Sequence, residues 1–237
     1  MSGMLSFLVN NWYLVLIAVA VAYLLGSVNT AVIVTNIFTK GKEDIREMGS
    51  GNAGFTNVLR SVGKVPAILT IVCDLLKSLI AVLIGGWLFA VAAGSSENID
   101  AVIRVGKYIC GFFCILGHSF PIYFHFKGGK GIVTAAGMML IADWRVFLMV
   151  FSTFLVVFII SRIISLASII GAITFPVYTF ILTFFFDYPS GYPILYVWLC
   201  TLAALGICVF VVIKHSSNIG RLLRGEEKKI KAKSSSK

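Results

Sequence analysis

The chain has 237 residues, of which 59% are hydrophobic and only 13% are charged, and its formal net charge is +10. A soluble domain is about half apolar and about one quarter charged, so this composition, with a mean hydropathy of +0.97, excludes an ordinary soluble enzyme. We therefore predict an all-α, polytopic membrane protein whose helical spans need about 20 residues each.

The first membrane span is expected over residues 12–38. No basic residue precedes its apolar run and no clear small-residue cleavage site follows, so this segment is interpreted as a retained span and not as a signal peptide. Small polar residues interrupt the span at Gly26, Ser27, Asn29 and Thr30. Because such residues are typical of helix–helix contacts in membranes, we expect this part to face protein and not lipid.

A polar loop, residues 39–64, leads to a second span over about 65–93, and a third span is expected over about 105–124. The second span carries Asp74 and Lys77 three residues apart. An acid–base pair inside a membrane either neutralises itself for structural reasons or belongs to a polar site. We expect this pair to hold in position the side chains that contact the ligand, without contacting the ligand itself.

The region 132–160 allows two interpretations. Residues 132–142 and 146–160 are each too short for an ordinary span, and Asp143, Trp144 and Arg145 separate them. Two short crossings, with later spans over about 163–186 and 193–213, make seven spans and place loops 39–64 and 117–131 on the side of the basic tail. A single crossing would put the tail on the opposite side and violate the positive-inside rule. We therefore predict seven spans, with the N-terminus outside and the C-terminus in the cytoplasm, in one domain ending in a tail of about residues 228–237.

The first stretch that suggests chemistry is residues 49–64, GSGNAGFTNVLRSVGK. Ser50, Asn52 and Asn57 supply compact hydrogen-bonding groups, and Arg60 adds a guanidinium. Two asparagines and an arginine within nine residues suit a polyol phosphate. The alternative is a flexible loop followed by a helix whose basic residues extend toward the membrane surface.

The second stretch, residues 117–131, reads GHSFPIYFHFKGGKG and sets two lysines among glycines before an apolar segment. Backbone N–H groups at such a helix start favour an anion, most simply a phosphate. The nucleotide-binding P-loop pattern is absent, because Lys130 is followed by Gly131 and not by Ser or Thr. His118 has either a structural role at the helix end or a catalytic one. The anion-binding candidates are Lys127, Gly128, Gly129, Lys130 and Gly131.

The third stretch, residues 214–229, reads KHSSNIGRLLRGEEKK. His215, Asn218 and Arg221 recur on one helix face, which brings a titratable base, an amide and a guanidinium together. The alternative is an amphipathic helix on the membrane surface. Ser165, at the start of the sixth span, is a further hydroxyl donor.

Together these stretches supply several anion binders, two candidate histidine bases and few acids. The pattern fits transfer between two anionic partners at a membrane surface, without a metal or another cofactor. The basic tail suits an anionic membrane surface better than a nucleic acid. Two other classes of function remain open: a transporter for an anionic solute, which predicts internal repeats that we do not find, and a non-catalytic protein that binds anionic lipid through its tail.

The three stretches resemble, in order and spacing, the motifs of the bacterial acyl-phosphate:glycerol-3-phosphate acyltransferases, the PlsY family. The resemblance extends to DLLKS in the second span and SLASI in the sixth, and so covers nearly the whole chain. It implies a seven-span enzyme of the bacterial inner membrane with its site on the cytoplasmic face. The implied reaction moves an acyl group from acyl-phosphate to the 1-hydroxyl of sn-glycerol 3-phosphate, giving lysophosphatidic acid and phosphate in the first step of phospholipid synthesis.

Carried over to matching positions, the resemblance implies a set of functional residues. The catalytic candidates are Ser50, Arg60, Lys130, His215 and Asn218. The substrate-binding candidates that it implies are Asn52, Lys127, Gly128, Gly129, Gly131, Ser165, Arg221 and Glu227. Asn57 and His118 are added as substrate-binding candidates from their residue types and their positions in the first two stretches. The base is either His215 or the departing phosphate. Departures from the family pattern at Ala53, Phe55, Ser78 and Glu226 lie between these residues, and Phe55 is expected to alter the shape of the pocket.

Overall fold

The structure is a computed structural model and describes residues 3–94 and 98–230. Within these ranges it consists of helices, turns and loops without a β-strand, which confirms the all-α prediction. Five helical stretches are long and apolar enough to cross a membrane: Trp12–Phe38, Lys64–Ala93, Trp144–Ser161, Ile164–Ser190 and Ile194–Lys214. Most of the predicted basic tail, residues 228–237, lies outside the described residues, which end at 230.

The first predicted span consists of two helices, α2 (Trp12–Gly26) and α3 (Thr30–Phe38), preceded by a short helix, α1 (Gly3–Asn10). The α2–α3 break arises because Asn29 leaves the helix and its side chain accepts a hydrogen bond from the Val32 amide at 3.3 Å, as an N-cap does. Gly26 lies directly against α6 (Ile99–Ser119), where a Cβ would come within 2.1 Å of the Cys114 carbonyl oxygen. The small polar residues around the break are buried, so the prediction that they face protein is confirmed.

A short helix, α4 (Phe55–Ser61), precedes α5 (Lys64–Ala93), which forms the second predicted span. The third predicted span corresponds to α6, which begins at Ile99 and not near residue 105 as predicted. Arg104 and Lys107 therefore lie inside the helix, and polar partners near its start accept their hydrogen bonds. The apolar pattern did not reveal this start, because Arg104 and Lys107 interrupt the pattern. Such residues can nevertheless continue a helix when their charges are paired.

The predicted interruption near residue 143 is confirmed. Helix α7 (Ile132–Ala142) ends there and α8 (Trp144–Ser161) begins, because the Asp143 side chain caps α8 by accepting the Arg145 amide at 3.0 Å. Helix α9 (Ile164–Leu182) continues through a π turn, Thr183–Asp187, and a 3-10 turn, Tyr188–Ser190. The last helices are α10 (Ile194–Lys214) and α11 (Ser216–Leu223).

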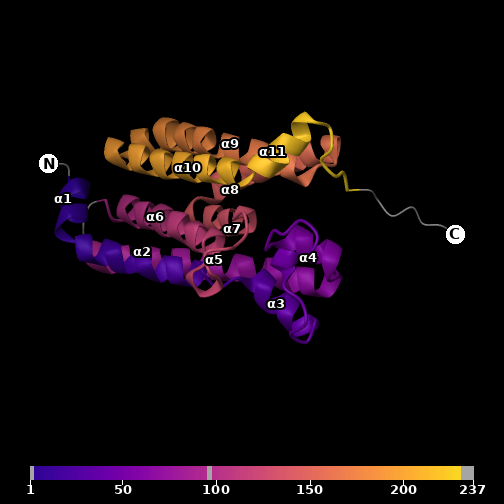
Figure 1. The fold of residues 1–237 in the computed structure, drawn as a ribbon. Coiled ribbons are helices and arrows are strands. Elements are labelled where there is room, and N and C mark those ends of the chain that lie inside the picture. The colour runs from indigo at the N-terminus through magenta and orange to yellow at the C-terminus, as the bar shows by residue number, and fades with distance from the viewer. Residues whose placement is uncertain (1–2, 95–97, 231–237) are drawn as a thin grey trace.

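The long helices lie side by side, with α6 between α2 and α5 on one side and α10 on the other (Figure 1). Helices α3, α4 and α11 lie at one end of this bundle and α1 at the opposite end. We call the former the loop-rich end, because residues 39–64, 120–131, 162–163 and 215–230 lie there. The start of α7 and the end of α8 both lie at this end. Lys130, just before α7, contacts Asn218, and the carbonyl of Arg162, just after α8, accepts a hydrogen bond from the Ile230 amide at 2.9 Å.

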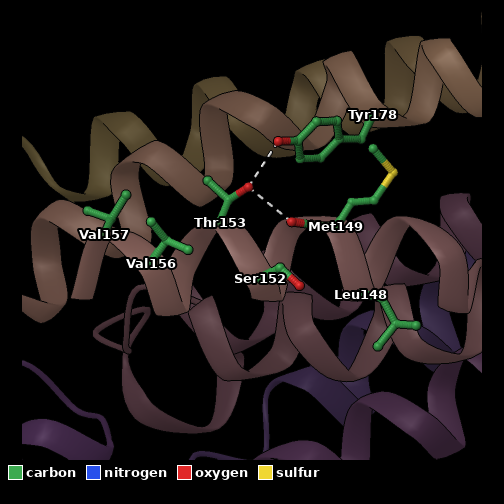
Figure 2. Close-up of a pocket in the computed structure, with 7 residues that line it drawn as sticks. All are labelled: Leu148, Met149, Ser152, Thr153, Val156, Val157 and Tyr178. Atoms are coloured by element: carbon green, nitrogen blue, oxygen red, sulfur yellow. Dashed lines mark hydrogen bonds between the residues drawn. The ribbon is translucent and has the colours of Figure 1, made fainter. Parts of the chain in front are cut away.

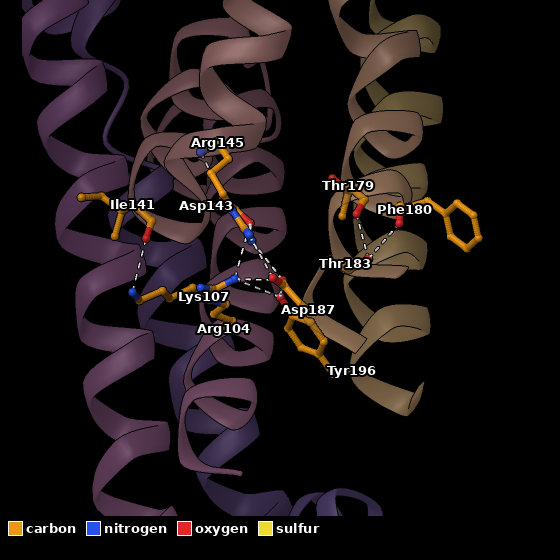
Figure 3. Close-up of polar contacts among 10 residues, drawn as sticks. All are labelled: Arg104, Lys107, Ile141, Asp143, Arg145, Thr179, Phe180, Thr183, Asp187 and Tyr196. Atoms are coloured by element: carbon orange, nitrogen blue, oxygen red, sulfur yellow. Dashed lines mark hydrogen bonds and ion pairs between the residues drawn. The ribbon is translucent and has the colours of Figure 1, made fainter. Parts of the chain in front are cut away.

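An ionic cluster joins four elements at the opposite end (Figure 3). The Asp187 carboxylate accepts bonds from Arg145 at 2.9 and 3.0 Å, from Arg104 at 3.1 Å and from the Tyr196 hydroxyl at 2.8 Å. Asp143 pairs with Arg145 at 2.6 Å. Two carboxylates thus balance two guanidinium groups, and the α7–α8 turn is fixed to α6, to the end of α9 and to α10.

We expect Asp187→Asn to lower the free energy of unfolding by about 3 kcal/mol, the lower limit for removing one partner of a buried ion pair. The lower limit applies because the two arginine side chains keep 28% and 26% of their surface exposed. Thermal unfolding in detergent micelles measures the change. Asp100→Asn, at an exposed position on α6, is the control. Equal stability of the two variants would show that the cluster does not hold this end together.

A shallow groove of about 500 Å³ lies on the side of the bundle between α8 and α9 (Figure 2). Its polar groups bond to each other, because the Thr153 hydroxyl lies 2.9 Å from the Tyr178 hydroxyl and donates to the Met149 carbonyl at 3.0 Å. None of the candidate site residues lines it. The groove is therefore a feature of α8–α9 packing and not the site sought here.

Candidate active site

A cavity of about 510 Å³ opens at the loop-rich end and gathers all three sequence stretches. The first stretch contributes through α4 and the loop before it, the second through the end of α6 and the start of α7, and the third through α11 and the segment after it. Twelve of the fifteen candidates line the cavity: Ser50, Asn52, Asn57, Arg60, His118, Lys130, Gly131, Ser165, His215, Asn218, Arg221 and Glu227.

Glu227 is the centre of the cavity's hydrogen-bond network. Its Oε1 accepts the Ser165 hydroxyl at 2.6 Å and the Asn218 amide at 2.7 Å, and its Oε2 accepts Nε of Arg221 at 2.6 Å. Burial raises the pKa of this carboxyl, but the three donors outweigh it, so the pKa is below its ordinary value. Glu227 is therefore ionised at neutral pH, and it ties the segment after α11 to the starts of α9 and α11.

Lys130 and Asn218 connect this network to residues 127–131 of the second stretch, which we call the glycine loop. The Lys130 ammonium donates to Oδ1 of Asn218, whose Nδ2 donates to Glu227. The orientation of the amide is fixed by these partners, since only its oxygen can face an ammonium and only its nitrogen can face a carboxylate. Burial, with a contribution from the charge of Arg221, lowers the pKa of Lys130 to about 8. Lys130 thus remains largely cationic at pH 7 and faces the cavity.

His215 lies at the junction of α10 and α11 and is buried. Its Nδ1 is 2.8 Å from the Val211 carbonyl oxygen, which can only accept, so Nδ1 carries the proton and Nε2 has the free lone pair. Burial lowers the pKa of His215 to about 4, against a smaller opposite effect of that hydrogen bond. The imidazole is therefore neutral at pH 7 and presents an acceptor.

Asn57 lines the cavity and also bonds to the backbone of the preceding loop. Its amide donates to the carbonyls of Ile45 and Met48 at 3.0 and 2.9 Å, and its oxygen accepts the Ser50 amide at 3.0 Å. These bonds use both amide hydrogens and leave little capacity for a ligand. Asn57 therefore holds the loop that presents Ser50, while Ser50 and Arg60 remain exposed toward solvent.

The sequence reasoning missed Arg46. Its guanidinium donates to the Phe124 carbonyl at 2.9 Å and pairs with Asp44 at 2.6 Å. The bond joins the first polar loop to the loop that leads into the glycines. Burial by itself would raise the Asp44 pKa, but the bonds from Arg46 lower it. The separation of 78 residues between Arg46 and Phe124 left no local signal for this contact.

The glycine loop is positioned by packing more than by its lysines. Gly129 lies against His118, where a Cβ would come within 2.3 Å of Nε2, and its amide donates to the His118 carbonyl at 3.2 Å. Gly131 has φ +80°, which favours glycine, as it caps α7. Gly128 packs on the His118 backbone. Lys127 is exposed, and neither it nor Gly128 nor Gly129 is among the residues that line the cavity.

Three comparisons with known proteins bear on this site. Residues 16–225 match the family model described as glycerol-3-phosphate acyltransferase. The chain is 36% identical over 228 residues to a glycerol-3-phosphate acyltransferase of Bartonella henselae, covering 96% of this chain and 95% of the relative. It is 40% identical to the one from Nostoc sp., with 90% of each covered. The chain belongs to the PlsY family of glycerol-3-phosphate acyltransferases.

Solved structures of this family agree with the fold. The glycerol 3-phosphate form of an integral membrane PlsY is similar to the chain with a TM-score of 0.71 and 34% identity, over 92% of this chain and 96% of that one. The lysophosphatidic acid form has a TM-score of 0.69, over 92% of this chain and 95% of that one. PlsY family membership, together with the apolar helices, identifies the chain as a multi-pass membrane protein.

Proposed function

We propose that this protein transfers an acyl group from acyl-phosphate to the 1-hydroxyl of sn-glycerol 3-phosphate, giving lysophosphatidic acid and phosphate. The observation that carries the proposal is the chain of contacts Lys130–Asn218–Glu227–Arg221 in a single cavity that Arg60 also lines. The four cations that line it, Arg60, Lys130, Arg221 and Lys228, exceed its two carboxylates, Asp74 and Glu227. A site with this charge favours two phosphate-bearing substrates whose mutual repulsion would otherwise keep them apart.

The chemistry needs no covalent bond to the protein, because the phosphate of an acyl-phosphate is already a good leaving group. In the proposed step the glycerol oxygen bonds to the carbonyl carbon, the bond from that carbon to the phosphate oxygen breaks, and the hydroxyl proton leaves. Lys130 is proposed to stabilise the negative charge that develops on the carbonyl oxygen and the departing phosphate. Ser50, Asn52 and Arg60 are proposed to hold the polyol phosphate at the exposed side, with Lys127 near the entrance.

An apolar cavity of about 350 Å³ adjoins the polar one and shares the lining residues Ile71, Ile132, Val133, Phe154 and Ser168 with it. Four stacked phenylalanines of α8, from Phe147 to Phe158, line the two cavities in turn. The continuity supports an acyl donor, because its chain and its phosphate then have adjoining places of matching polarity.

Topology follows from the two ends of the bundle. We propose that α7 and α8 are separate crossings, since the ionic cluster holds their junction at the end opposite the cavity. Counting α2–α3 as one, the chain then crosses seven times as one integral-membrane domain. With the N-terminus outside and the C-terminus inside, the loop-rich end faces the cytoplasm, as the positive-inside rule requires. The proposed location is the bacterial inner membrane.

His215→Asn is expected to change the pH dependence of the reaction if His215 is the base. The pKa of about 4 means that the imidazole keeps its free lone pair above this pH and loses it as the pH falls through this value. The rate of the native enzyme should therefore fall on the acid side near pH 4, and this acid limb should be missing from His215→Asn. A pH–rate profile with unchanged shape would assign the proton to the departing phosphate. His125→Asn, at an exposed position outside the cavity, is the control.

The direct test uses purified protein with palmitoyl-phosphate and labelled glycerol 3-phosphate. We expect labelled lysophosphatidic acid, and we expect palmitoyl-coenzyme A to be a much poorer donor. Folded protein that forms no product would refute the proposal. Uptake of labelled glycerol 3-phosphate into proteoliposomes without acylation would favour a transporter, and equal use of both donors would remove acyl-phosphate as the specific partner.

A further inference from the structure

The buried ammonium of Lys77, on α5, has three acceptors around it. Its Nζ lies 2.8 Å from the Val28 carbonyl oxygen, 2.8 Å from Oδ1 of Asp74 and 2.9 Å from Nδ1 of His118. An ammonium carries three N–H donors and no acceptor. The hydrogen bond to His118 can therefore have only one direction: Lys77 donates, and Nδ1 of His118 accepts.

This direction determines where His118 keeps its own proton. A neutral imidazole carries one N–H, and since Nδ1 is an acceptor, the hydrogen is on Nε2. The other nearby candidate partner, Oδ1 of Asp74, is 3.5 Å from Nδ1 and already accepts the Thr30 hydroxyl at 2.7 Å. Asp74 thus neutralises Lys77, and its own contact with the ring, at 3.5 Å, is longer than the 2.9 Å contact of Lys77.

The Nε2–H group points to the glycine loop. A Cβ at Gly129 would come within 2.3 Å of it, and His118 lines the polar cavity together with Lys130. The hydrogen bonds found among residues 3–94 and 98–230 include none at Nε2 of His118, whereas Nδ1 accepts from Lys77. The Nε2–H donor therefore lies beside the glycine loop, at the edge of the cavity that His118 lines.

We propose that Lys77 is a positioning residue that fixes the tautomer of His118, and that His118 donates its Nε2–H to an anionic oxygen of the substrate beside the glycine loop. The proposal rests on the proposed function for the identity of that oxygen. His215 has the opposite tautomer, with Nδ1–H on the Val211 carbonyl. The cavity thus has one histidine that donates and one that accepts, and His118 is not the base.

Nitrogen-15 NMR of the full-length protein with labelled histidines, in detergent at neutral pH and without substrate, tests the tautomer. The three histidine signals are assigned with His118→Gln, His125→Gln and His215→Gln. We expect His118 to be protonated on Nε2 only and His215 on Nδ1 only. A proton on Nδ1 of His118 would overturn the proposal. Because no catalysis is measured, this result is independent of whether acyl transfer is the function.

The role of Lys77 is tested with the double variant Asp74→Asn/Lys77→Met, which removes one charge of each sign and so leaves no unpaired buried charge. We expect the Nδ1 signal of His118 to shift and the ring to populate both tautomers. An unchanged signal would show that Lys77 does not fix the tautomer.

A pair of substitutions at His118 provides a second, catalytic test. Glutamine places an amide N–H near the position of Nε2, whereas the shorter asparagine places it near Nδ1. We expect His118→Gln to keep KM for the phosphate substrates within about fivefold of the native enzyme, and His118→Asn to raise it about 10- to 100-fold, the effect of one hydrogen bond to a charged group. Equal KM values for the two variants would overturn the donor role.

Discussion

Replacing Lys130 with alanine is expected to lower turnover about 100- to 1,000-fold, the effect of removing one donor that stabilises developing negative charge. The side chain is the cavity's link between the glycine loop and Asn218. Its ammonium is also largely protonated at pH 7, because burial lowers the pKa only to about 8. Turnover is measured as lysophosphatidic acid formed at saturating concentrations of both substrates.

The fold should survive this change, since Lys130 is not part of the buried core. An unchanged thermal unfolding temperature would show this. Lys42→Ala provides the matched control, because Lys42 is an exposed lysine of the first polar loop that does not line the cavity. If Lys130→Ala turned over substrate at the native rate, the glycine loop would not belong to the reacting centre.

Glu227→Gln is expected to lower kcat about 100-fold, the cost of misplacing reacting groups by about 1 Å. The carboxylate is held by three donors, from Ser165, Asn218 and Arg221. A neutral amide cannot accept all three equally well, and one of its atoms becomes a donor. Asn218 would then lose the partner that orients it toward Lys130. The substitution should therefore also change the position of the Lys130 side chain in the glycine loop.

Glu226→Gln is a closely matched control. Glu226 is the neighbouring residue, but it is 57% exposed and pairs with Arg224, itself 60% exposed, so it is expected to contribute little. We expect native activity for Glu226→Gln and a large loss for Glu227→Gln. Similar activities of the two variants would mean that the Glu227 network does not position the site.

The sequence predicted those features of the fold that have local signals. Apolar length located the spans, and the triplet Asp143-Trp144-Arg145 correctly marked the junction of α7 and α8, because Asp143 is a local cap. The break after Gly26 was recognised as a place of helix contact but not as the end of α2. Its cause, the Asn29 cap on the Val32 amide, competes with an unbroken helix and leaves no strong pattern.

The site could be assembled only partly from the sequence. Residue types within each stretch indicated anion binding, yet the bond between Ser165 and Glu227 joins residues 62 positions apart and has no local signature. Asn57 was predicted to contact substrate because its type fits, but the backbone around it uses its hydrogen bonds. Lys127 and Lys130 look equivalent in sequence, whereas the turn after Phe126 leaves Lys127 exposed and Lys130 half-buried.

Direct transfer within one cavity predicts a specific result in an exchange experiment. Purified protein is incubated with palmitoyl-phosphate and [32P]phosphate, first without and then with glycerol 3-phosphate. If both phosphates must occupy the cavity together and no acyl group is attached to the protein, no label enters palmitoyl-phosphate in the absence of glycerol 3-phosphate. Rapid labelling in its absence would reveal an acyl-enzyme intermediate and contradict direct transfer.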